Sequence, residues 1–119
     1  DRAARHPLVL RAFALPGLLP EVLAAVQDAV PVDALAADVM SGRVRVGVAA
    51  GAIPEVSALR ALRARLEALG GSLVLERAEA GLLAAVPAYG HGGRAGALGA
   101  ALRARFDPGG VLSAGRFAP

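Results

Sequence analysis

The residues of this 119-residue chain best suited to binding a small anion are arginines. All 13 basic residues are arginine, and Arg11, Arg43 and Arg45 are among those that fall within predicted strands. A guanidinium group binds a carboxylate through two parallel hydrogen bonds. These three arginines are therefore candidates for binding the carboxylate of a small substrate. The alternative is a solvated sheet face on which they form ion pairs with Asp38 and Glu76.

Tyr89 and His91 lie in a glycine-rich segment, residues 89–93, of the kind that often carries functional side chains. A histidine titrates near neutral pH and can accept a proton from a hydroxyl group. Both residues are candidates for substrate binding, and the alternative is that they are ordinary surface residues. The other histidine, His6, precedes Pro7 and is interpreted as part of a linker. No catalytic residue can be assigned from the sequence.

The composition excludes several kinds of chemistry. The chain has no cysteine and only two histidines, which excludes a thiolate nucleophile and a cysteine- or histidine-rich metal site, so we expect no metal. The net charge is only +3 and aromatic residues make up 3% of the chain, which argues against a nucleic-acid-binding protein. No apolar run reaches the ~18 residues needed to cross a bilayer.

The elements that must position the arginines alternate between strands and helices. The pattern predicts, in chain order, a strand over 8–15, a helix over 19–29, two strands on either side of Ser41-Gly42, a helix over 54–69 and a strand over 72–78. Pro54 suits the first turn of the second helix, and Gly70-Gly71 suits its end. The order βαββαβ is that of a ferredoxin-like α+β domain, a four-stranded antiparallel sheet with helices on one face.

The two central strands are predicted to form a hairpin whose turn is Ser41-Gly42. In this register Asp38 faces Arg45, an opposite-charge pair, and Val39 faces Val44. One face of the hairpin is then apolar, and the other carries Asp38, Met40, Arg43, Arg45 and Gly47. A slip by one residue would mix the two faces, so the pattern favours one register.

The sheet face without helices is the predicted site. It collects the polar residues of the strands, namely Arg11, Asp38, Arg43, Arg45 and Glu76. We expect residues 1–119 to form a single domain with its core at about 7–78. Helical segments over about 79–88 and 94–105 and a tail extend it. Asp107, before Pro108, is interpreted as the end of the last helix rather than a chemical group.

The tail carries the most specific pattern in the chain. A helix ending in Arg-x-Arg is followed by Phe106-Asp-Pro-Gly-Gly-Val-Leu-Ser-Ala-Gly-Arg116. This stretch resembles the C-terminal signature of FAD-linked oxidases of the vanillyl-alcohol-oxidase type. Residues 62–78 are also similar to a helix, Gly-Gly and strand unit of the glycolate oxidase FAD-binding subunit. Ser113-Ala114 stand where that family usually has Asn-Pro.

The resemblance implies that this chain is the C-terminal cap or substrate domain of a longer flavoprotein, an expectation that its first residue, Asp1 rather than Met, also favours. In such enzymes an N-terminal domain holds most of the FAD, and the cap covers the flavin and shapes the substrate pocket. The substrate would be glycolate, lactate or another 2-hydroxy acid. Residues carried over as cofactor contacts are Ser113, Gly115 and Arg116. The isolated chain should then be inactive.

The resemblance also implies partners: the missing FAD-binding domain and other oxidase subunits, including an iron–sulfur subunit. The location would be cytoplasmic, either free or at the membrane periphery through those subunits. The alternative, from another class, is a free-standing ferredoxin-like module that binds a small effector or dimerises through its open sheet face. The fragment could dimerise through that face under either hypothesis, since detachment would uncover a docking surface.

Overall fold

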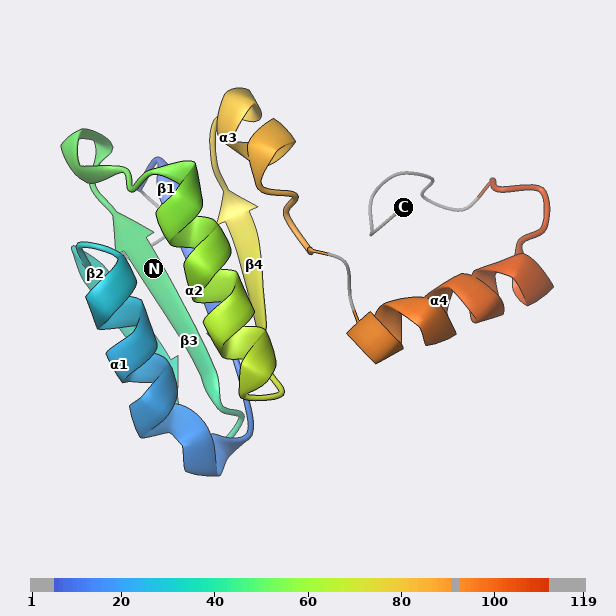
Figure 1. The fold of residues 1–119 in the computed structure, drawn as a ribbon, viewed down its shortest axis with the longest axis horizontal. Helices are drawn as coiled ribbons and strands as arrows, with labels where there is room; N and C mark the ends of the chain where they lie inside the picture. Colours follow the sequence, from blue (N-terminus) through green and yellow to red (C-terminus); the bar gives the residue numbers. More distant parts are fainter. Residues whose placement is uncertain (1–5, 91–92, 112–119) are drawn as a thin grey trace. The chain divides into compact units, whose positions relative to one another are not determined.

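The computed structural model describes residues 6–90 and 93–111 (Figure 1). Its elements, in chain order, are β1 (Leu8–Phe13), α1 (Leu19–Ala29), β2 (Ala34–Asp38), β3 (Arg43–Val48), α2 (Val56–Ala68), β4 (Ser72–Arg77), α3 (Ala80–Ala85) and α4 (Gly93–Phe106). The chain divides into two compact units, Asp1–Ala88 and Tyr89–Pro119, which are described separately.

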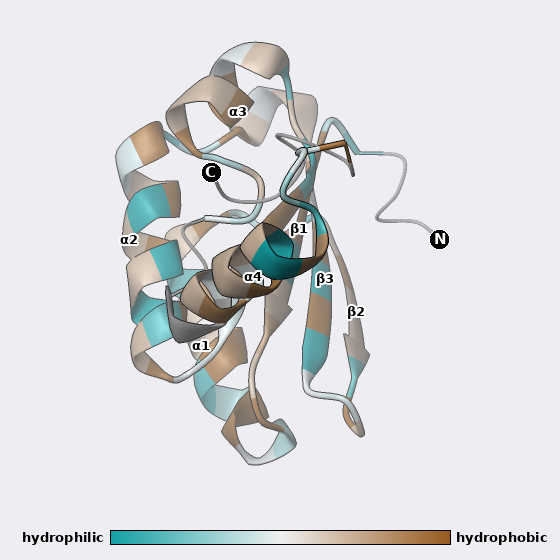
Figure 2. Cartoon of the chain, turned by 90° about the vertical axis from the view of Figure 1, so that its right-hand side faces the viewer, coloured by the Kyte–Doolittle hydropathy of each residue, from teal (hydrophilic) through white to brown (hydrophobic). Residues whose placement is uncertain are grey.

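In the first unit the four strands form one antiparallel sheet in the order β2-β3-β1-β4. Helices α1 and α2 cover one face of this sheet and leave the other without a helix of the βαββαβ core (Figures 1 and 2). The predicted ferredoxin-like α+β fold is confirmed. The face not covered by α1 and α2 carries Arg11, Arg43, Arg45 and Glu76, and is called the open face below.

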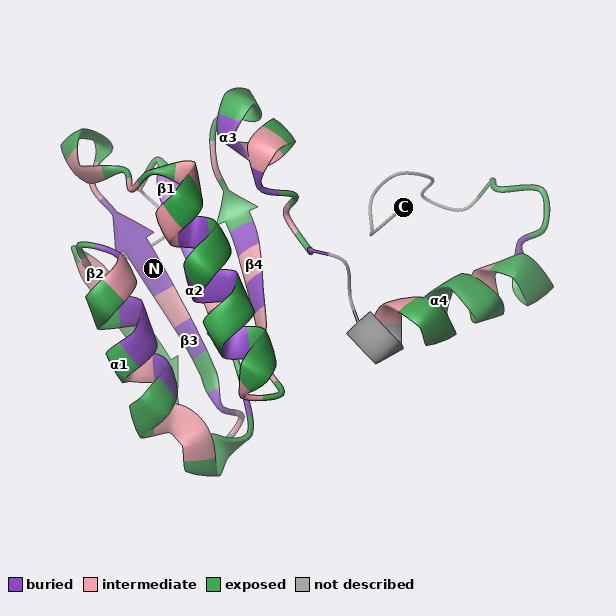
Figure 3. Ribbon diagram, viewed as in Figure 1, coloured by how far each residue is buried: buried purple, intermediate pink, exposed green. Residues whose placement is uncertain are grey.

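Alternation along the strands decides which side chains meet the helices. Leu8, Leu10 and Ala12 of β1 are each 1% exposed, and the β3 residues opposite them are the fully buried Val48, Val46 and Val44. The helices contribute the buried residues Val22, Ala25, Val26, Leu59, Leu62 and Leu66. Buried positions therefore follow β1, β3, β4 and the inner sides of both helices (Figure 3). Each fully buried aliphatic side chain contributes roughly 1.5–3 kcal/mol of hydrophobic stabilisation.

The predicted register of the β2–β3 hairpin is wrong by two residues. Asp38 lies opposite Arg43, not Arg45, and Ala36 takes the place opposite Arg45. The loop therefore spans four residues, 39–42, instead of the predicted two. Because the shift is an even number of residues, each side chain stays on its predicted face of the sheet.

The side chain of Asp38 explains the longer loop. Its carboxylate accepts hydrogen bonds from the amides of Met40 and Ser41, at 3.1 and 3.3 Å. The Gly42 amide donates to the Asp38 carbonyl at 3.0 Å, and Gly42 adopts a left-handed φ of 70°. An aspartate that bonds the backbone two and three residues ahead stabilises a turn of its own. The predicted Asp38–Arg45 contact is lost because Asp38 is held within this turn.

Helix α2 begins two residues later than the predicted 54–69 and ends one residue earlier, at Ala68, with the predicted Gly70-Gly71 just beyond it. Val56 is its first residue, so Pro54 lies before the first turn rather than in it. At the other end the Gly70 amide donates to the Glu67 carbonyl and the Gly71 amide to the Leu66 carbonyl. This is a Schellman motif, which requires a left-handed residue, and Gly70 has φ 79°.

The second unit contains α4, which matches the helix predicted over about 94–105. Leu98, Leu102 and Phe106 recur every four residues along it and are 62%, 48% and 74% exposed. After the helix, the buried Asp107 accepts a hydrogen bond from the Val111 amide through its carboxylate, at 3.1 Å. Asp107 thus closes the turn that follows the helix, as the sequence indicated.

Candidate functional site

Two arginines of the open face share one carboxylate. Arg45 Nε donates to Glu76 Oε2 at 2.7 Å, and Arg11 Nη1 lies 3.3 Å from Glu76 Oε1. The side chains of both arginines are about one-third exposed to solvent, and that of Glu76 is 21% exposed. Ion pairs this exposed contribute about 0.2–1 kcal/mol each. The network therefore orients the two guanidinium groups more than it stabilises the fold.

A β-bulge places Glu76 in this network. Along the β1–β4 ladder Val9 lies opposite Arg77, whereas the next residue, Leu10, lies opposite Leu75. Glu76 is therefore the extra residue of β4. A bulge of this kind redirects side chains and is common beside functional sites. The alternation in the sequence placed Glu76 on the open face correctly but gave no sign of the bulge.

Arg43 occupies a different position on the same face. It lies beside a hollow of about 220 Å³ lined by Arg11, Phe13, Arg43, Ser72 and Val74. Among the described residues Arg43 forms no hydrogen bond or ion pair, although its charge acts on Asp38 across the β2–β3 ladder. The hollow thus has two guanidinium groups, one hydroxyl group and two apolar side chains. This set suits a carboxylic acid of a few atoms.

The charges around the hollow favour an anion. The open face carries three arginines and two carboxylates, those of Glu76 and Asp38, so positive charge is in excess. The Ser41 side chain, the Ser41 and Met40 amides and the Arg43 guanidinium together hold the pKa of Asp38 below its usual value. Asp38 is therefore ionised at neutral pH and moderates the charge of Arg43 without a direct salt bridge.

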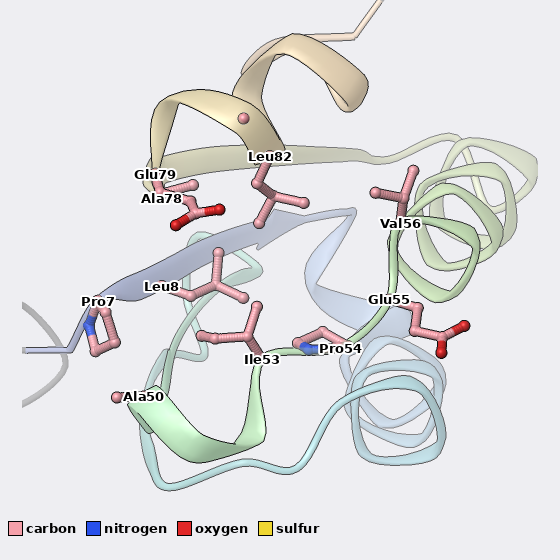
Figure 4. Close-up of a pocket in the computed structure, with 11 residues that line it drawn as sticks. Pro7, Leu8, Ala50, Ile53, Pro54, Glu55, Val56, Ala78, Glu79 and Leu82 are labelled. Carbon is pink, nitrogen blue, oxygen red and sulfur yellow. The ribbon is translucent and has the colours of Figure 1, made fainter.

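A second, larger cavity of about 620 Å³ lies at one end of the sheet (Figure 4). Leu8, Ile53 and Leu82 converge within it, and Glu55 and Glu79 are the charged residues of its lining. A cavity with two carboxylates and no cation repels an anionic substrate. The smaller hollow on the open face is therefore the better candidate site for an anionic ligand.

The predicted loop and tail residues are placed only in part. Tyr89 begins the second unit and is 37% exposed. His91, Ser113, Gly115 and Arg116 lie outside the described residues. The structure thus brings together Arg11, Arg43 and Arg45 on one face.

His6 is docked on the sheet rather than part of a loose linker. Its Nε2 lies 2.5 Å from Asp33 Oδ2, and its side chain is only 13% exposed. The ring lies over Gly47, where an added Cβ would come within 2.6 Å of His6 Nδ1. The sequence contains Gly47 within a strand, a sign of close approach by another group, but it does not show which group approaches.

Arg63 is a buried arginine on the inner side of α2, 9% exposed. Its Nη2 donates to the carbonyls of Leu73 and Ala88, at 3.0 and 3.1 Å. Burial lowers the pKa of Arg63, and the charge of Glu67 opposes this shift. Arg63 thus ties the helix to β4 and to the segment after α3, a structural role outside the candidate site.

Comparisons with protein-family models, with curated proteins and with solved structures find no match to this chain. Within residues 6–90 and 93–111, no cluster of three histidine, aspartate or glutamate side chains could hold a metal ion. The helices of the same described residues are all too short or too polar to cross a membrane. The fold and the candidate site together define a ferredoxin-like α+β domain with a cationic open face.

Proposed function

We propose that this chain is the C-terminal cap domain of an FAD-dependent 2-hydroxy acid oxidoreductase, similar to the glycolate oxidase FAD-binding subunit. The observation that carries the proposal is the hollow on the open face, where Arg43 has no ion pair among the described residues and Arg11 lies beside it. A 2-hydroxy acid brings one carboxylate and one hydroxyl group. A sheet face with excess guanidinium charge and a small, partly apolar hollow is complementary to that ligand.

Each lining residue has a role in this proposal. Arg43 binds the substrate carboxylate through two hydrogen bonds, and Arg11, held by Glu76, adds a second positive charge. Phe13 and Val74 supply an apolar wall that limits water around the ion pair, which strengthens it. Ser72 offers a hydroxyl group to the hydroxyl or carboxylate of the acid.

The flavin, when bound, supplies the acceptor for the hydride that leaves the substrate. Its main binding site belongs to the proposed N-terminal domain, and Ser113, Gly115 and Arg116 are the proposed contacts from this chain. The positive charge of the open face fits a group that gains negative charge on reduction. In this proposal the chain positions the hydroxy acid, and its arginines complement the negative charge of the acid and of the reduced flavin.

The turn after α4 supports the resemblance of the tail to the C-terminal signature of FAD-linked oxidases. The signature residues Asp107 and Pro108 stop the helix, and Asp107 is buried with its carboxylate bonded to the Val111 amide. This explains why the signature has an aspartate at this position, because a buried, hydrogen-bonded aspartate fixes the direction in which the tail leaves the helix. The exposed apolar side chains of α4 suit a domain that packs against a further part of a longer protein.

Titration of the chain with glycolate tests substrate binding by the open face. We expect glycolate, but not the neutral glycolamide, to shift the NMR signals of the Arg43 and Arg11 side chains. Arg43→Gln should weaken binding at least about tenfold, since a charge-assisted hydrogen bond is worth about 1.5–3 kcal/mol. Arg65→Gln, on the exposed side of α2, is the matched control. Equal binding by wild type and Arg43→Gln would overturn the assignment.

A further inference from the structure

The two edges of the sheet differ in how they are covered. At the β4 edge the Leu75 amide donates to the Ala88 carbonyl at 2.9 Å, so the segment after α3 pairs with part of this edge. At the other edge, among residues 6–90 and 93–111, only β3 pairs with β2. The backbone groups on the outer side of β2 can therefore accept another strand.

Strand β2 has few of the features that usually prevent edge pairing. Natural edge strands are protected by short length, by charged residues such as lysine, by proline or by a bulge, and of these β2 has only its five-residue length and Asp38. Residues 34–38 are Ala-Leu-Ala-Ala-Asp, and their register with β3 is unbroken. Apart from the partly buried Ala34, all of them are exposed. The only charge is that of Asp38, at the last position of the strand.

Large apolar side chains are exposed along the same edge. Leu35 lies on the helix side of the sheet, opposite Val46, yet it is 42% exposed. Val39 and Met40 continue from the end of β2 and are 63% and 87% exposed. A further strand beside β2 would cover Leu35 and satisfy the backbone of the edge.

We propose that this further strand is β2 of a second copy, so that the chain forms a symmetric dimer with one continuous sheet. Antiparallel pairing with Ala36 on the two-fold axis is the only register that pairs all five residues of β2. It sets Asp38 opposite Ala34 of the second copy and Leu35 opposite its Ala37, so no like charges meet. The axis is perpendicular to the sheet, so both Leu35 side chains lie on the helix side, diagonal to each other.

The size of the contact sets its strength. Five paired residues extend over about 17 Å of strand. An interface built on one strand pair and a few apolar side chains falls below the roughly 1,200 Å² of stable complexes. The dimer is therefore weak and reversible, and its population rises with protein concentration.

A charge-swap experiment on the chain tests this dimer. Ala36 faces its own copy across the axis, so Ala36→Asp and Ala36→Lys each bring like charges together. We expect sedimentation velocity to show a concentration-dependent dimer for wild type and monomers for each variant alone at the same concentration. An equimolar mixture of the two variants should restore the dimer. Ala64→Asp, on the exposed side of α2, should behave as wild type.

The controls separate this edge from other surfaces. Circular dichroism checks that each variant is folded, and Leu35→Lys replaces any variant that is not. Phe13→Ser lies on the open face and should keep the edge dimer, whereas it would weaken a face-to-face dimer. The proposal is overturned if wild type stays monomeric at millimolar concentration, if the variants with like charges still dimerise, or if their mixture stays monomeric.

Discussion

Arg45 and Glu76 lie on strands that are not neighbours, yet Arg45 Nε donates to Glu76 Oε2 at 2.7 Å. The bond spans β1, whose Arg11 contacts the other oxygen of the same carboxylate. Glu76 therefore holds two guanidinium groups in place and moderates their charge. The geometry of the open face depends on this one carboxylate.

Replacement of the Glu76 carboxylate should change the stability of the fold and the affinity for an anion in opposite directions. Glu76→Gln keeps the shape of the side chain and removes its charge, so both arginines become available to a ligand. We expect a loss of at most about 1 kcal/mol in the free energy of unfolding, because the pairs are partly exposed. Glycolate should bind several-fold more tightly. Urea denaturation and an NMR titration measure the two effects, with Glu67→Gln as control. Weaker glycolate binding would contradict this role of Glu76.

The contact between His6 and Gly47 predicts an interaction between two substitutions. Gly47→Ala places a methyl group where the His6 ring lies, so the ring must move away from Asp33. Overpacking of this kind costs about 1–3 kcal/mol. The same substitution should cost much less in a His6→Ala background, because the ring is no longer there. Equal costs in both backgrounds, measured by chemical denaturation, would show that His6 does not lie on Gly47.

Arg63 should hold the segment after α3, which contains Ala88, against the β4 edge of the sheet. Arg63→Met keeps the length of the side chain but leaves the Leu73 and Ala88 carbonyls without its hydrogen bonds. Loss of a buried partner costs about 1–3 kcal/mol. We expect faster hydrogen exchange at the Leu75 amide, which donates to the Ala88 carbonyl. Unchanged exchange at Leu75 would mean that the segment is held without Arg63.

Asp38 gives a prediction for the dependence of stability on pH. Its pKa is lower in the folded chain than in the unfolded chain, so its contribution to stability is fully present above the unfolded pKa. That contribution is lost as the pH falls through the folded pKa. Asp38→Asn should therefore flatten the acid dependence of stability, whereas Ser57→Ala should leave it unchanged. Urea denaturation over a series of acidic pH values measures this dependence, and the same dependence in Asp38→Asn as in wild type would contradict the prediction.

Much of the fold could be predicted because patterning and turn residues agree. Alternation in β3 and the leucine stripe of α2 gave the buried faces, and Gly70 gave the end of the helix. The register of the hairpin was missed because loops of two and four residues keep the same faces. Only the hydrogen bonds of Asp38 to the amides of Met40 and Ser41 decide between them.

The details of the site depend on contacts that local patterns do not contain. The open-face arginines were located from alternation, but their shared partner Glu76 sits at a bulge. His6 bonds to Asp33, 27 residues away, and Arg63 bonds to Ala88, 25 residues away. An arginine on a helix is ordinarily read as exposed, so a buried one that binds distant carbonyls is not foreseen.

The most direct test of the proposed function uses the intact protein encoded by the reading frame that contains this chain. We predict that it purifies with bound FAD and that glycolate or lactate bleaches the flavin absorbance in the absence of oxygen. Arg43→Gln should raise the acid concentration needed for half-maximal bleaching, and Arg65→Gln should not. A protein without flavin, or a flavin that no short 2-hydroxy acid reduces, would contradict the account.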